Sequence, residues 1–97
     1  MVDKLKIIST FVNKQSHNLI NSMDENLNTF AKRLLQARIK AKLSMEKLSE
    51  KMNGIVTKQA ISKYEKGMMM PNSTILIAMA EALNVSLDYF FRPFTYD

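Results

Sequence analysis

Apolar residues recur at intervals of three and four along most of this chain, and that spacing is typical of amphipathic helices. It constrains the fold more than any other feature, because the 97 residues include only two glycines and two prolines. The chain therefore has few of the residues that form the turns of β-hairpins, whereas the abundant leucine, methionine, lysine and glutamate favour helices. The length suits one small domain. We therefore expect a single all-α domain.

The residue types exclude several classes of protein. The sequence has no cysteine and one histidine, His17, so we expect no disulfide, no metal site of the usual kinds and no cysteine nucleophile. No Ser-His-Asp set and no phosphate-binding glycine loop is found, and the carboxylates are scattered, so we expect neither an enzyme nor a cofactor. The longest apolar run, residues 75–80, is too short to span a membrane. No signal segment is found at the N-terminus, and a soluble, cytoplasmic protein is expected.

The positive charge is concentrated in the middle of the chain. The formal net charge is +5, yet residues 32–66 hold ten basic and three acidic residues, while the remainder is slightly acidic. A basic block with apolar residues at helical spacing is expected of a surface that binds phosphates, and a solvated lysine-rich helix face is the alternative.

Residues 28–42 show the clearest helical pattern. Asn28 is the expected N-cap, because its side chain can accept hydrogen bonds from the first free amides. The apolar face consists of Phe30, Leu34, Ala37 and Ala41, and the polar face of Lys32, Arg33, Gln36 and Lys40.

Two short helices follow, joined by a tight turn. The first covers residues 44–52, with Ser44 as its N-cap, and ends at Asn53-Gly54. The second starts after Thr57 and ends before Gly67, which can adopt the left-handed conformation common at helix ends. Its inward residues are Ile61 and Tyr64. Its outer face then carries Lys58, Gln59, Ser62, Lys63 and Lys66. This arrangement is that of a helix-turn-helix, whose second helix fits the major groove of DNA.

Two further helices are predicted at residues 74–83 and 86–91, the first capped by Asn72 or Ser73 and the second by Ser86. They have more apolar residues than one core face needs, and exposed apolar patches usually mark an interface. Local packing is the alternative, but we favour a homodimer contact for this surplus. Its members are Ile75, Ile77, Phe91 and Phe94.

Residues 1–27 follow helical spacing with gaps and contain many asparagines and serines. A docked helix, a dimerisation arm and a frayed leader all fit. We divide the chain into this N-terminal extension (1–27), a DNA-binding domain (28–92) and a C-terminal tail (93–97).

Residues spread over four predicted helices match one known family in type and order. They are Leu43-Ser44-Met45-Glu46-Lys47-Leu48, Gln59-Ala60-Ile61-Ser62-Lys63-Tyr64-Glu65-Lys66-Gly67, Pro71, and Ala80-Glu81-Ala82-Leu83-Asn84-Val85-Ser86-Leu87-Asp88. Over residues 28–92 the chain resembles the phage-repressor-type helix-turn-helix regulators, also called xenobiotic-response-element-like. The resemblance implies a five-helix DNA-binding domain that is usually dimeric on an inverted-repeat operator.

The resemblance also assigns roles to individual positions. It implies that Arg38 and Glu65 form a buried ion pair between the first helix and the recognition helix. The implied base contacts are Lys58, Gln59, Ser62 and Lys63. The expected contacts to the DNA backbone are Ser44, Thr57 and Lys66.

Two functions remain open from the sequence. The first is a sequence-specific regulator of transcription, a repressor that binds a palindromic site in double-stranded DNA as a homodimer. The second is a protein-interaction module, such as an antitoxin or partner-sensing regulator, which would bind its partner through residues 1–27.

Overall fold

The computed structural model describes residues 11–94, with side chains described from residue 25 onward. Four α-helices and one 3-10 helix follow one another in this range, which contains no strand, so the all-α expectation is confirmed. They are α1 (Phe11–Lys40), α2 (Met45–Lys51), α3 (Lys58–Glu65), α4 (Ser73–Leu83) and η2 (Leu87–Phe91). The expectations for residues 1–10 lie outside the described residues.

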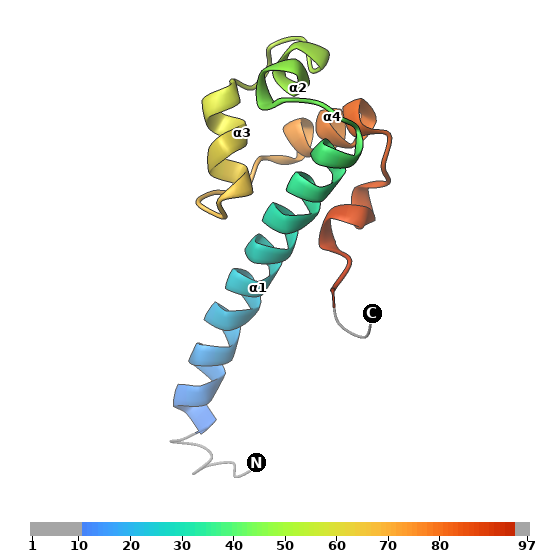
Figure 1. Cartoon of the computed structure of the whole chain (residues 1–97). Coiled ribbons are helices and arrows are strands. Elements are labelled where there is room, and N and C mark those ends of the chain that lie inside the picture. Colours follow the sequence, from blue (N-terminus) through green and yellow to red (C-terminus); the bar gives the residue numbers. More distant parts are fainter. Residues whose placement is uncertain (1–10, 95–97) are drawn as a thin grey trace.

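Helix α1 is the longest element and runs as one rod of 30 residues (Figure 1). Its C-terminal half packs against α3 and η2, whereas its N-terminal half extends away from the other helices. The predicted N-cap at Asn28 is therefore wrong, because Asn28 lies inside the helix. Asparagine costs a helix interior only a few tenths of a kcal/mol, too little to end α1 there.

Phe30 is at the centre of the core and has no exposed surface. Its ring meets that of Phe90 edge to face, with centroids 5.3 Å apart, and that of Tyr64 at 6.4 Å. One α1 side chain thus joins α3 and η2. The other core positions on α1 are Ala31, Leu34 and Ala37. Leu34 and Ala37 were predicted, whereas the predicted Ala41 is exposed because α1 ends at Lys40.

All four α-helices end in the same way, with a left-handed residue that lets the chain turn back. The φ angles are 60° at Lys42, 60° at Asn53, 72° at Gly67 and 58° at Asn84. In each case the next amide donates to a carbonyl five residues earlier, as Met68 N does to Lys63 O at 2.9 Å. This is the Schellman arrangement, which satisfies carbonyls that the helix leaves free.

The last helix differs from the expectation. η2 is a 3-10 helix, and Ser86 precedes it without making a side-chain capping bond. This short helix places Phe90 in the core against Phe30. Burial of that ring, which removes apolar surface from water, outweighs the poorer hydrogen-bond geometry of a short 3-10 turn.

Candidate nucleic-acid interface

Helices α2 and α3 form the predicted helix-turn-helix, and the turn between them is held by several bonds. Asn53 and Gly54 both have positive φ, at 60° and 74°. Gly54 N donates to Ser49 O at 2.9 Å, and Ser49 Oγ donates to Val56 O at 2.6 Å. Val56 is itself buried. These contacts fix the path by which the chain leaves α2 and enters α3.

Both helices begin with the predicted caps. Ser44 Oγ accepts a hydrogen bond from Lys47 N at 3.0 Å, and Thr57 Oγ1 accepts one from Ala60 N at 3.1 Å. Ser44 and Thr57 are exposed at the two helix starts, where free amides and the helix dipole favour an anion. Their contact with a DNA backbone remains a prediction.

One side of helix α3 packs on the core, and the opposite side is exposed to solvent. Ile61 and Tyr64 are buried, which confirms Tyr64 as a core residue. The opposite side of the helix lies at the edge of the molecule, with no other element outside it in Figure 1. The five predicted contact residues of α3 and its C-cap are together on this side. Lys58, Gln59, Lys63 and Lys66 are exposed, and Ser62 is half-buried.

The outer face of α3 is positive. Its one carboxylate, Glu65, turns inward to Arg38. Within residues 25–94, the ion pairs are Arg38–Glu65, Lys47–Glu50 and Arg92–Asp88, none of which involves a lysine of α3 or its C-cap. The ammonium groups on this face can therefore bind phosphates or base acceptors without breaking an ion pair in the described part of the chain.

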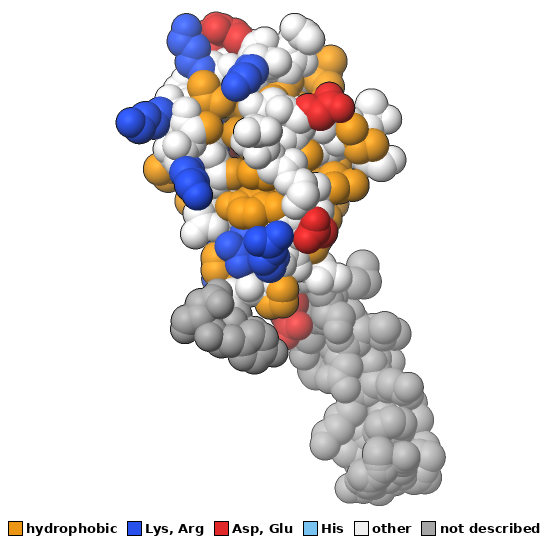
Figure 2. Space-filling model, turned by 90° about the vertical axis from the view of Figure 1, so that its right-hand side faces the viewer, with side chains coloured by type: hydrophobic (Ala, Val, Ile, Leu, Met, Phe, Trp, Pro, Cys, Tyr) orange, Lys and Arg blue, Asp and Glu red, His pale blue; other side chains and the backbone are white. Residues whose placement is uncertain are grey.

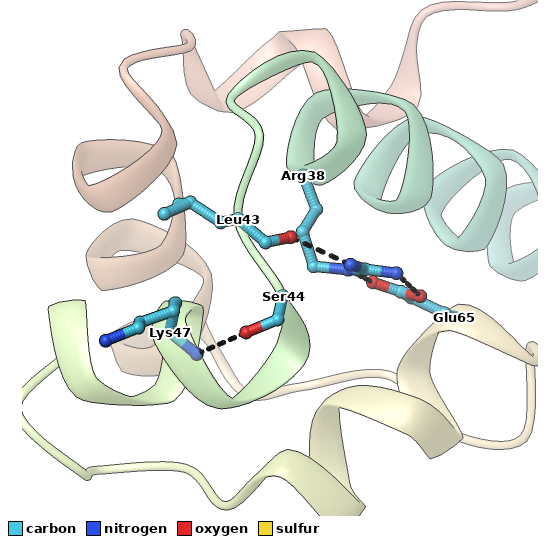
Figure 3. A network of polar contacts seen from close by, with 5 residues as sticks. All are labelled: Arg38, Leu43, Ser44, Lys47 and Glu65. Carbon is cyan, nitrogen blue, oxygen red and sulfur yellow. Dashed lines mark hydrogen bonds and ion pairs between the residues drawn. The ribbon is translucent and has the colours of Figure 1, made fainter.

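Arg38 ties α1 to the last residue of α3 (Figure 3). Its Nε donates to Glu65 Oε2 at 2.5 Å and its Nη2 to Glu65 Oε1 at 3.0 Å, while Nη1 donates to Leu43 O at 2.9 Å. Only 12% of the Arg38 side chain and 5% of the Glu65 side chain are exposed. The hydrogen bonds that Arg38 donates to the Glu65 carboxylate raise the pKa of the Arg38 guanidinium. One guanidinium thus joins α1, α3 and the segment that leads into α2.

Arg33 is not on the outer face of α1, where it was expected. Only 9% of the residue is exposed. Its Nε donates to Arg92 O and its Nη2 to Pro93 O, both at 2.9 Å, and the guanidinium lies 3.8 Å from the centre of the Phe94 ring. Arg33 therefore fastens the C-terminal segment to α1 and is withdrawn from the basic surface. Nothing local in the sequence signals this, since its partners lie about sixty positions away.

The surplus apolar residues divide into two groups. Ile75 is half-buried and packs on the core, as in the local-packing alternative. Ile77, Phe91 and Phe94 are 49%, 37% and 39% exposed. Figure 2 views the side of the molecule that carries η2 and the C-terminal segment, and hydrophobic side chains are exposed there among scattered charged ones.

Other kinds of site find little support in the described part of the chain. Its Asp and Glu side chains form no group of three that could hold a metal ion. None of its helices is long and apolar enough to cross a membrane.

Comparison with known proteins agrees with this geometry. A family model described as helix-turn-helix matches residues 34–90, more than half of the chain. That range runs from the C-terminal half of α1 to Phe90 and includes α2, α3 and α4. No curated protein and no solved structure matches the chain.

Proposed function

Because the chain belongs to the phage-repressor-type helix-turn-helix family of DNA-binding transcription regulators, we propose that it places α3 in the major groove of double-stranded DNA. There it reads a specific operator sequence and acts as a repressor by occupying it. We also propose that the protein acts in the cytoplasm.

The observation that carries this proposal is the exposed polar side of α3. It is opposite Ile61 and Tyr64, which are 0% and 4% exposed and hold the helix to the core. The major groove admits one α-helix, whose first turn reaches the base edges. Lys58 and Gln59 are in that first turn, and Lys63 is one turn further along.

The side chains suit base recognition. A glutamine amide can bind adenine through two hydrogen bonds, and a lysine can donate to the acceptors of guanine. We therefore assign base contacts to Lys58, Gln59 and Lys63, with Ser62 beside them. Ser44, Thr57 and Lys66 are assigned to the DNA backbone, because they lie at the starts of α2 and α3 and at the end of α3.

A homodimer on a palindromic site completes the proposal. Two recognition helices would then lie about 34 Å apart, one turn of DNA. The exposed Ile77, Phe91 and Phe94 support an apolar contact between two copies.

The experiment is a binding selection from a random pool of DNA duplexes, with sequencing of the retained fraction at two salt concentrations. The wild type is compared with Lys58→Ala/Gln59→Ala/Lys63→Ala. Lys32→Ala/Lys40→Ala, which removes two exposed lysines of α1, is the matched control. A palindrome enriched by the wild type and the control but not by the α3 variant supports the proposal. If all three proteins retain DNA equally, in a salt-sensitive way and without a common motif, the protein does not recognise a specific sequence and the proposal is contradicted.

A protein-interaction module is the second candidate, and the projecting half of α1 favours it (Figure 1). That half is continuous with the half that packs on α3. In this reading, a partner protein binds residues 1–27. Removal of residues 1–24 spares Phe30, Leu34 and the rest of the core on α1. If this truncation changes neither DNA binding nor the capture of any partner, the second function is wrong.

A further inference from the structure

Three consecutive methionines follow α3 and are exposed to solvent. Met68, Met69 and Met70 are 63%, 39% and 39% exposed, whereas Met52 and Met79 are 2% and 0% exposed. A run of three exposed apolar residues adds nothing to the core and is unusual unless it has a function. The domain therefore buries Met52 and Met79 and exposes three consecutive methionines in one loop.

This methionine loop, residues 68–70, is fixed at both ends. At one end Met68 N donates to Lys63 O at 2.9 Å, directly after Gly67 turns the chain with a φ of 72°. At the other end Pro71 is buried, and Asn72 caps α4. The loop is therefore attached to the last turn of α3, which it follows directly in the chain (Figure 1).

We propose that residues 68–70 are an oxidation site through which hydroperoxides weaken the binding of DNA, an inference that rests on the proposed function. The thioether sulfur attacks the peroxide, the O–O bond breaks and an S–O bond forms. Methionine sulfoxide and water, or an alcohol, are the products. The sequence contains no cysteine, so these exposed thioethers are the most accessible oxidisable sulfur atoms among the described residues.

Oxidation changes the chemistry next to α3. A flexible apolar side chain becomes polar and gains a sulfoxide oxygen that accepts hydrogen bonds. Lys63 and Lys66 are exposed at the end of α3, to which the loop is bonded through Lys63 O. The new oxygens would compete with phosphates for these ammonium groups and would repel phosphate oxygens nearby.

The test treats the full-length protein with hydrogen peroxide and measures two quantities. Peptide mass mapping should find added oxygen on residues 68–70 before Met52 or Met79 is modified. DNA affinity, measured with the sequence selected above, should fall by on the order of ten-fold, equivalent to about 1.4 kcal/mol. A methionine sulfoxide reductase should restore it, since this oxidation is enzymatically reversible.

The matched control is Met68→Leu/Met69→Leu/Met70→Leu, which keeps apolar side chains of similar volume. The affinity of this variant should be the same before and after peroxide. If oxidised and untreated wild type bind equally, or if the leucine variant loses affinity as the wild type does, the inference is wrong. If untreated wild type binds no DNA, both the inference and the proposed function fail, so the two failures are distinguishable.

Discussion

Gly67 lies so close to Asn28 that a Cβ atom on the glycine would come within 3.3 Å of the Asn28 side-chain oxygen. The same atom would lie 3.9 Å from the Cβ of Ala31. The end of α3 therefore approaches α1 at a point where a side chain on Gly67 would require the Asn28 amide to give way by a few tenths of an ångström. Gly67 also has a φ of 72°, which L residues with side chains adopt only at a cost.

Gly67→Ala should destabilise the domain by about 2 kcal/mol, because the left-handed backbone and the crowding at Asn28 both oppose it. Gly54→Ala is the matched control, since Gly54 has a φ of 74° but a Cβ atom added there would have no neighbour within 4 Å. It should cost only about 1 kcal/mol, the backbone contribution. Urea unfolding followed by circular dichroism measures both. Equal losses would show that the approach to α1 has no energetic consequence.

Glu65→Ala should cost about 3 to 5 kcal/mol and abolish DNA binding through unfolding, because it leaves the Arg38 guanidinium buried without its carboxylate. The replacement of both partners, Arg38→Met/Glu65→Leu, should restore much of that stability. Thermal unfolding of the three proteins checks the order. A Glu65→Ala protein that is folded yet fails to bind DNA would assign Glu65 to the interface instead.

Lys42→Gly should stabilise the protein by about 0.5 to 1 kcal/mol, because Lys42, two residues after the end of α1, has a φ of 60° that glycine adopts without strain. Asn84→Gly is the comparison, at a φ of 58°. Its gain should be smaller, since asparagine tolerates the left-handed region better than lysine does. Midpoints of chemical unfolding provide the measurement, and a loss of stability in Lys42→Gly contradicts the argument.

Stability should decline as the pH rises above 10. Burial raises the pKa of Tyr64 above its ordinary value of 10.0, so the folded chain retains a phenol proton that the unfolded chain releases. This contribution is present in full below pH 10.0 and is lost as the pH rises through the folded-state pKa. Tyr64→Phe should show a weaker decline than the wild type in unfolding measurements from pH 9 to 11. Identical slopes in the two proteins would contradict the assignment.

Much of the fold is readable from the sequence because it depends on local chemistry. Ser44, Thr57 and Asn72 each cap a helix with a side chain that accepts from an amide three residues on. Ile61 and Tyr64 face inward because both are on the apolar side of a short amphipathic helix. That spacing also predicts which side of α3 is exposed.

The differences arise where distant segments decide the outcome. Arg33 looks like any basic residue of a polar helix face, and only the return of Arg92 and Pro93 to α1 buries it. Lys42 has no left-handed preference of its own, yet the turn into α2 imposes that conformation on it. Asn28 resembles a cap, but α1 continues through it.

Because α1 is continuous, the rotation of residues 11–24 about the helix axis is fixed relative to the core. Each residue of an α-helix advances about 1.5 Å and turns about 100°. One alanine inserted before Glu25 would rotate residues 11–24 around the axis of α1 by that angle, while the core from Phe30 onward kept its packing. Each further inserted residue would add another 100° of rotation, and four inserted residues would bring this segment back to within about 40° of its original orientation.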